Sequence, residues 1–151
     1  HLAVRRQRQM CIRDRAYIST PEVAAIRKQL KEQLPQYKFS VKRDHTSSVT
    51  VAFMKGPAWE TFQSRDRYTG EFKDDAIEGH EQLNHHWATD FYGEKNGAII
   101  KKVEKIIKTA PYLEGVGDLW FDKSDSMSDY FHTAYYMSIH VGKWDKPYQV
   151  V

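Results

Sequence analysis

Residues 37–57 read YKFSVKRDHTSSVTVAFMKGP, and this stretch decides the fold that the sequence predicts. It contains two runs in which apolar and polar residues alternate, separated by a polar turn at residues 44–47. Such alternation places every second side chain on the same face of a strand, so each run predicts a half-buried β-strand. Gly56 and Pro57 end the second run, because proline cannot donate a hydrogen bond in a strand ladder. The stretch therefore predicts a β-hairpin with one face toward a core.

A helix is predicted immediately before this hairpin. Ser19-Thr20-Pro21-Glu22 supplies a hydroxyl cap, a proline in the first turn and a carboxylate near the positive end of the helix dipole. Apolar residues then recur every three or four positions, as an amphipathic helix requires: Val23, Ile26, Leu30 and Leu34. Pro35 is expected to stop the helix.

The region after the hairpin alternates between irregular and regular patterns. Residues 58–80 predict a long loop with a short helical turn around Trp59 and Phe62. A third strand is predicted across Gln82–Tyr92, because its residues alternate in polarity. A second helix is predicted to begin with Asn96 as its cap and to end at Pro111. Its buried stripe would be formed by Ile99, Ile100, Val103, Ile106 and Ile107.

Two further strands complete the expected architecture. Leu119-Trp120-Phe121 predicts a short strand, and the final strand is predicted across Ala134–Trp144. Its inward side chains would be Tyr135, Met137, Ile139 and Val141. The sequence thus predicts an α+β fold, with a single antiparallel sheet of four to five strands and two helices packed on one face. We expect residues 16–151 to form a single domain.

Residues 1–15 have a different character from the rest of the chain. Met10–Arg15 resembles a translated sequencing-transposon end, since the DNA read ATG TGT ATA AGA GAC AG encodes Met-Cys-Ile-Arg-Asp. We therefore expect a non-native leader without stable tertiary contacts. The leader contains five arginines and one aspartate, so the rest of the chain has 18 basic and 19 acidic residues. The overall net charge of +3 therefore does not indicate a basic domain. The leader also holds Cys11, the sole cysteine.

The helix, the Phe39-Ser40-Val41 strand and the alternating strand that closes on Gly56-Pro57 together resemble a known family. This family is the large polyvalent protein-associated domain of type 29, carried by phages and other mobile elements. Two positions depart from its pattern, since Phe53 and Lys55 stand where tryptophan and aspartate are expected. The resemblance implies a phage-encoded accessory protein, concerned with counter-defence against the host. It implies no catalytic residues.

One candidate binding surface is the basic hairpin. Residues 22–55 contain seven basic and three acidic residues, whereas the last 43 residues contain three basic and six acidic ones. A local basic patch can contact phosphates although the whole chain is not basic. The candidate nucleic-acid contacts are Lys38, Lys42, Arg43 and Lys55. The alternative interpretation is that these cations keep an exposed hairpin from aggregating.

A second candidate site is a metal centre. His86, Asp90 and His140 would share a polar face if the third and last strands were neighbours, and two histidines with one carboxylate are a common metal-binding set. Asp122–Asp129 carries side-chain oxygens of the kind found in calcium loops, but it lacks the glycine and the closing glutamate of the helix-loop-helix site. Exposed or core histidines and an ordinary polar turn are the alternatives.

Three hypotheses for function follow from these patterns. The first is a non-enzymatic accessory protein that binds a host or phage protein; the second is a nucleic-acid-binding module; the third is a metal-dependent enzyme. The first is favoured by the family resemblance and because the sequence contains no nucleophile elbow and no phosphate-cradling glycine loop. No cofactor is expected. No segment predicts a membrane span. We expect the protein to be located in the cytoplasm of the bacterial host. The oligomeric state stays open.

Overall fold

The computed structural model describes residues 16–65, 67–77, 79–122 and 133–151. The leader at residues 1–15 and residues 123–129 of the calcium hypothesis lie outside the described residues. The first half contains helix α2 (Thr20–Gln33), strands β1 (Lys38–Asp44) and β2 (Ser48–Gly56), and the short strands β3 (Phe62–Arg65), β4 (Phe72–Asp75) and β5 (Glu81–Leu83). The second half contains the 3₁₀ turn η1 (His85–Trp87), helices α3 (Ala88–Tyr92) and α4 (Glu94–Leu113), and strands β6 (Tyr136–Val141) and β7 (Gln149–Val150).

The main sheet has the order β1-β2-β6-β5, with β7 paired to the end of β2. The predicted hairpin is confirmed, because β1 and β2 are antiparallel with Val41 opposite Val51. The β2–β6 and β2–β7 pairs are parallel, however, so the expectation of a wholly antiparallel sheet is wrong in this detail. Alternation reports which face of a strand is buried, but it does not report the direction of the neighbouring strand.

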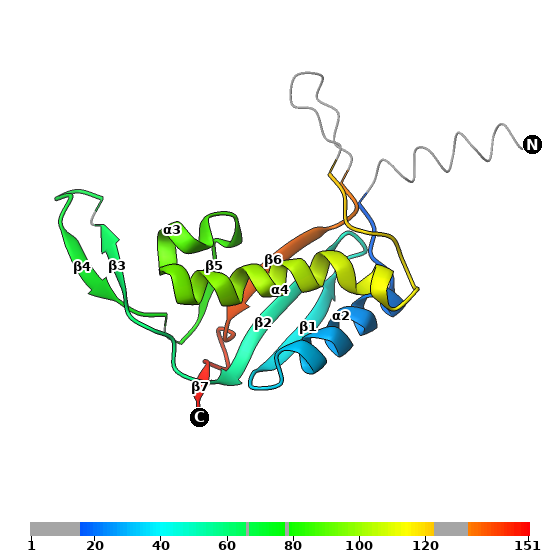
Figure 1. Ribbon diagram of the computed structural model, residues 1–151, viewed down its shortest axis with the longest axis horizontal. Helices are drawn as coiled ribbons and strands as arrows, with labels where there is room; N and C mark the ends of the chain where they lie inside the picture. Colours follow the sequence, from blue (N-terminus) through cyan, green and yellow to red (C-terminus); the bar gives the residue numbers. More distant parts are fainter. Residues whose placement is uncertain (1–15, 66, 78, 123–132) are drawn as a thin grey trace, which may run out of the picture.

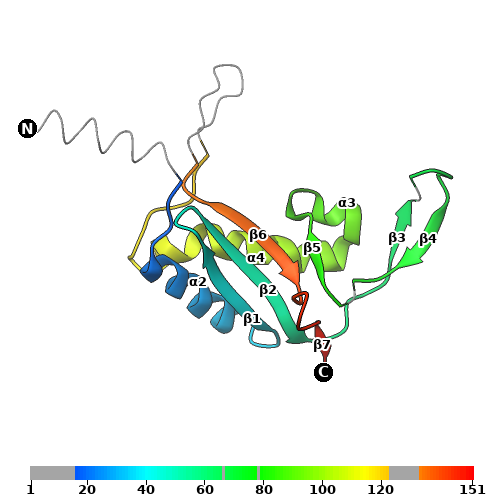
Figure 2. The same ribbon diagram turned by 180° about the vertical axis from the view of Figure 1, so that it is seen from behind.

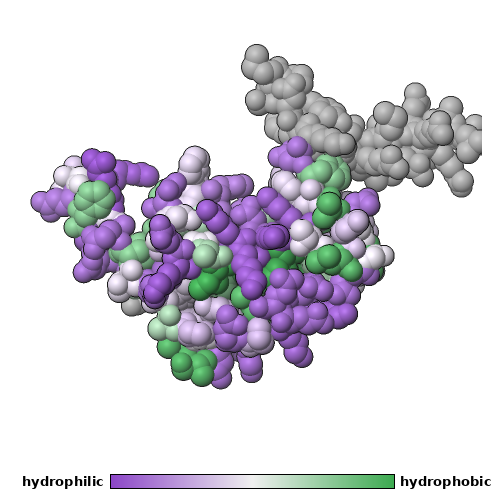
Figure 3. All heavy atoms as spheres, viewed as in Figure 1, coloured by the Kyte–Doolittle hydropathy of each residue, from purple (hydrophilic) through white to green (hydrophobic). Residues whose placement is uncertain are grey.

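Helices α2 and α4 cover one face of this sheet, as predicted (Figure 1). The predicted hydroxyl cap of α2 is confirmed, because the backbone N–H of Glu22 donates to Ser19 Oγ (3.3 Å). Glu22 completes a capping box, since its Oε1 accepts from the backbone N–H of Ser19 (3.1 Å). The stripe of α2 and that of α4 meet the inward residues of β1, β2 and β6 in the core. The outer side of the helices is largely hydrophilic (Figure 3), which agrees with the exposed lysines of α4.

The loop predicted at residues 58–80 is instead built around a β-hairpin. Strands β3 and β4 pair as a separate two-stranded sheet that projects from the body of the molecule (Figures 1 and 2). Trp59 packs edge-on against Phe53, with ring centroids 4.9 Å apart, and forms no helical turn with Phe62. The hairpin escaped prediction because its strands are short and mostly exposed, so they carry no clear apolar alternation.

The strand predicted across Gln82–Tyr92 is wrong beyond Leu83. The chain turns into η1 and α3, and the Asn84 side chain begins this turn by accepting from the backbone N–H of Trp87 (3.3 Å). Leu83, Trp87 and Phe91 are four residues apart, a spacing that fits both an alternating strand and one side of a helix. The segment Leu119-Trp120-Phe121 likewise forms no strand, although Asp122 bridges to Thr133.

Two expectations about α4 need correction. The cap of this helix is Gly93, while Asn96 lies in its first turn with its side chain buried. Pro111 lies inside the helix, which continues to Leu113. The last strand is shorter than predicted, but its inward side is confirmed, since Tyr135, Ile139 and Val141 are buried and Met137 packs against the core.

Candidate functional site

The face of the main sheet opposite α2 and α4 has no described helix across it (Figure 2). Its side chains follow from the strand register. One row across the sheet contains Ser40, Ala52, His140 and Gln82. The adjacent row contains Lys42, Thr50 and Ser138. We call this the open face. It is formed by small and polar side chains, in contrast to the aliphatic and aromatic core on the other side.

A hollow of about 190 Å³ lies on the open face. It extends from Lys42, Thr50 and Ala52 on the hairpin to His140 on β6, and residues 142–145 form its rim. Trp144 stands on this rim with 86% of its surface exposed. Few residues of this size are left so exposed in a folded chain, and a tryptophan beside a hollow is a frequent anchor for a binding partner.

Two glycine loops bring the rim of the hollow together. Gly142 has a φ of +65°, and a Cβ placed on it would lie 2.2 Å from the carbonyl oxygen of Gly79. The backbone N–H of Tyr148 donates to that same oxygen (2.9 Å), and the N–H of Gly142 donates to Phe53 (2.7 Å). This close crossing requires glycine at position 142. It places His80, which follows Gly79, next to β6.

His80 and His140 stack over the hollow, with ring centroids 6.3 Å apart and planes inclined by 11°. Burial lowers the pKa of His140, and the neighbouring His80 lowers it further, whereas Asp44 opposes the shift. Asp44 itself accepts a hydrogen bond from Thr50 Oγ1. His140 therefore favours its neutral imidazole near pH 7, which can donate one hydrogen bond to a partner and accept another.

The structure divides the four residues of the predicted nucleic-acid set. Lys42 lines the hollow on the open face. Arg43 lies in register with the buried Val49 and donates to the carbonyl oxygen of Ile18 (3.4 Å), so it belongs to the other side of the sheet. Lys38 and Lys55 are register partners at the far end of the hairpin, beside a β-bulge. The four cations therefore do not form one continuous patch.

The three residues of the predicted metal set are also separated. His86 lines a pocket beside α4, Asp90 lines another beside β3, and His140 lines the hollow on the open face. The strand that was to align His86 with Asp90 is replaced by η1 and α3. Within the described ranges, no group of three or more His, Cys, Asp or Glu side chains is arranged to hold a metal ion.

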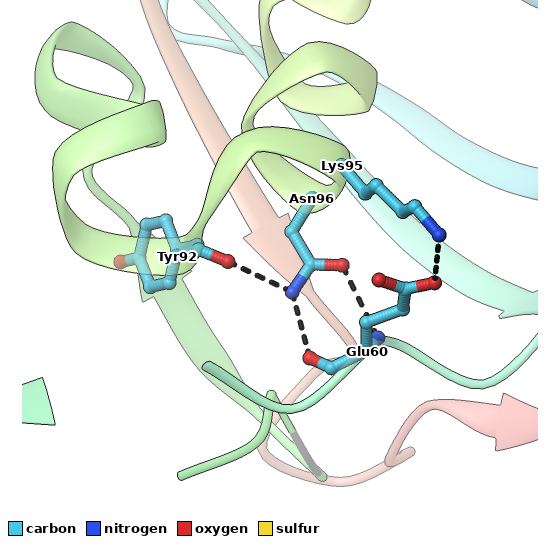
Figure 4. A network of polar contacts seen from close by, with 4 residues as sticks. All are labelled: Glu60, Tyr92, Lys95 and Asn96. Atoms are coloured by element: carbon cyan, nitrogen blue, oxygen red, sulfur yellow. Dashed lines mark hydrogen bonds and ion pairs between the residues drawn. The ribbon is translucent and has the colours of Figure 1, made fainter. Parts of the chain in front are cut away.

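Asn96 is the centre of a polar network in the pocket beside β3 (Figure 4). Its Nδ2 donates to the carbonyl oxygens of Glu60 (2.8 Å) and Tyr92 (3.0 Å), and its Oδ1 accepts from the N–H of Glu60 (3.2 Å). Lys95 adds an ion pair to the Glu60 carboxylate (3.1 Å). Both polar atoms of the Asn96 side chain are thus hydrogen-bonded, and two of these bonds hold the backbone of Glu60. The network therefore anchors the chain that leads into the β3–β4 hairpin.

Sequence reasoning missed His80, Lys143 and Trp144, which together with Lys42 and His140 define the open-face hollow. No spacing rule joins residues 42, 80, 140 and 144. The one available signal was the pair of glycines at 79 and 142, whose close approach depends on the tertiary fold.

The comparisons with known proteins agree with the resemblance that the hairpin carries. No curated protein and no solved structure matches the chain. None of the helices in the described part of the chain is long and apolar enough to cross a membrane. The family model of large polyvalent protein associated domain 29 matches residues 18–112, which include α2, the β1–β2 hairpin and nearly all of α4. The chain therefore belongs to the large polyvalent protein associated domain 29 family, a domain family associated with phages and mobile elements.

Proposed function

We propose that this chain is a protein-binding module of a phage or mobile-element protein, and that its contact surface is the open face around Trp144. The observation that carries this proposal is an 86% exposed tryptophan beside a hollow, on a sheet face that none of the described helices covers. Tryptophan is enriched among the residues that dominate the binding energy of protein interfaces. A side chain of the partner can be buried in the hollow, next to Trp144.

The charges around the hollow favour a protein partner over a polyanion. Lys42 and Lys143 are balanced by Asp44 and Asp145 in the same lining. A surface that binds phosphates has an excess of cations, whereas protein interfaces combine both signs in a polar rim around an apolar centre. The expected partner segment presents one apolar side chain to the hollow, with acidic and basic groups flanking it.

The family association suggests where such a partner is found. A domain associated with phages acts in the cytoplasm of the bacterial host when it engages host proteins. Counter-defence is the case in which the partner is a host defence protein. Neither activity requires a catalytic residue or a cofactor in this chain.

The test compares three immobilised proteins: the wild type, Trp144→Ala and the control Trp87→Ala. Trp87 is 60% exposed on η1 and does not line the hollow, so its removal deletes an exposed tryptophan elsewhere. Lysates of phage-infected bacteria supply the candidate partners. We expect one protein to be retained by the wild type and by Trp87→Ala, and its retention to fall about 30-fold with Trp144→Ala. Equal retention by all three proteins would rule out the open face as the contact surface.

Nucleic-acid binding is the second candidate, because Trp144 lies beside Lys143 and Lys42. An exposed aromatic ring can stack on a base while nearby cations contact phosphates. Gel-shift titration with single-stranded DNA at two salt concentrations, with and without residues 1–15, separates this function from an effect of the arginine-rich leader. Binding that weakens with salt and depends on Trp144, but not on the leader, would favour the second candidate.

A further inference from the structure

The outer edge of β6 is interrupted by a gap. At one end, β5 pairs with Ile139–Val141. At the other end, the N–H of Ala134 donates to the carbonyl oxygen of Phe121 (2.9 Å), and Trp120 Nε1 donates to that of Tyr135 (2.6 Å). Between these two segments, residues 136–138 pair with β2 on one side and with no other described strand on the outer side. The gap is thus three residues long, or about 10 Å at the rise of a β-strand.

The strand geometry directs the backbone N–H and C=O of one residue into this gap. The N–H of Tyr136 donates to Ser47 on the β2 side, whereas the carbonyl oxygen of Tyr135 accepts from Trp120 on the outer side. Because these directions alternate along a strand, the N–H and C=O of Met137 face outward. Within the described part of the chain these two groups have no hydrogen-bond partner. By contrast, the edge of β1 is partly covered, since Arg27 Nη2 donates to the carbonyl oxygen of Val41 (2.9 Å).

A pocket of about 240 Å³ occupies this gap. Its aromatic lining is formed by Trp120, Tyr136 and the His85–His86 pair, whose ring centroids are 4.2 Å apart. Lys108 and Glu104 form an ion pair of 2.9 Å on the α4 side, and the Lys108 ammonium group lies 4.6 Å from the centre of the Trp120 ring. The pocket thus combines flat π surfaces with an outward-facing backbone donor and acceptor.

We propose that this pocket binds a nucleobase, which pairs through its hydrogen-bonding edge with the N–H and C=O of Met137 and stacks on Tyr136. A nucleobase is planar and carries adjacent donors and acceptors, so it can form the two bonds that a neighbouring strand would form at this position. Stacking on aromatic side chains accepts any base, since every base has a π face. This site is separate from the open-face hollow, which shares none of its lining residues.

The closed ends of the gap argue against an extended peptide, which is the other kind of ligand that pairs with a strand edge. An extended peptide joins a sheet by running along the edge for several residues. Here β5 blocks one end, and residues 120–122 block the other. A single ring fits between them, whereas a continuing strand does not.

The test is an NMR titration of the full chain with adenosine, guanosine, cytidine and uridine, observing the backbone amides. At least one nucleoside is expected to shift the amide resonance of Met137 at millimolar concentration, because its N–H gains an acceptor. The Ser138 amide points toward β2 and serves as the internal reference. If none of the four nucleosides moves the Met137 resonance, the proposal is wrong.

Variants then test the stacking surface. Tyr136 is 53% exposed, so Tyr136→Ala should fold, and it is expected to weaken nucleoside binding about tenfold or more. Tyr112→Ala, which removes a similarly exposed tyrosine from α4, should leave binding unchanged. Equal binding by Tyr136→Ala and the wild type would overturn the stacking geometry.

A final comparison identifies the source of the base. The nucleoside that binds is compared with its 5′-monophosphate and with a short single strand of the same base. Tighter binding of the strand assigns the pocket to a base within nucleic acid, and equal binding assigns it to a free nucleoside or nucleotide. Both results support the proposal when Tyr136→Ala weakens the binding and Tyr112→Ala does not.

Discussion

At the scale of single residues, the continuation of α4 through Pro111 depends on one tyrosine. Proline has no N–H, so the carbonyl oxygen of Ile107 loses its partner one turn earlier. The Tyr135 hydroxyl donates to this oxygen instead. Burial raises the pKa of Tyr135 far above its usual value, which keeps the hydroxyl protonated as a donor. The predicted helix end at Pro111 was wrong because the compensating group comes from a distant part of the chain.

This pairing makes a prediction about stability. Tyr135→Phe leaves the Ile107 carbonyl buried without a partner, so the free energy of unfolding should fall by about 1–3 kcal/mol. In a Pro111→Ala background the alanine N–H can donate to the Ile107 carbonyl oxygen. Tyr135→Phe should then lower the free energy of unfolding by less than about 1 kcal/mol. Urea denaturation of the four proteins measures both values. An equal loss in the two backgrounds would contradict this account of the helix.

At the scale of elements, the patterns that predicted correctly are those in which local and tertiary requirements agree. Ser19 caps α2, and Val41 and Val51 face the core, because capping and alternation need no distant partner. The parallel pairing of β2 with β6 was not predictable, since no local signal encodes strand direction. The open-face hollow was missed for a related reason: Trp144 and His140 meet His80 only after the chain crosses itself at Gly142.

The β3–β4 hairpin shows how an element depends on a remote side chain. A two-stranded hairpin has little stability by itself, and Asn96 holds the chain at Glu60, just before β3. Asn96→Asp replaces the amide donor by an oxygen that faces two carbonyls, so we expect a loss of about 3 kcal/mol and faster proteolysis of the hairpin. In the control Asn84→Asp, the acceptor for Trp87 is retained. Its stability should stay within about 0.5 kcal/mol of the wild type. If the two variants unfold alike, Asn96 does not anchor the hairpin.

At the scale of the whole molecule, two partly buried histidines link stability to pH. Burial lowers the pKa of His85 and of His140 from the usual 6.5, and in each case the adjacent histidine lowers it further. Glu104 opposes the shift at His85, and Asp44 opposes it at His140. The unfolded chain therefore binds protons at these histidines more readily than the folded chain does. Their contribution to stability is fully present above pH 6.5 and is lost as pH falls through their folded pKa values. Burial raises the pKa of Glu81, which acts in the opposite direction at lower pH.

The wild type should therefore have a lower urea midpoint at pH 5.5 than at pH 7.5. The double variant His85→Asn/His140→Asn removes both linked groups, so its midpoint should change less between the two pH values. His45→Asn alters an exposed histidine in the β1–β2 turn and should retain the wild-type dependence. If the double variant is as sensitive to acid as the wild type, carboxylates govern the acid response.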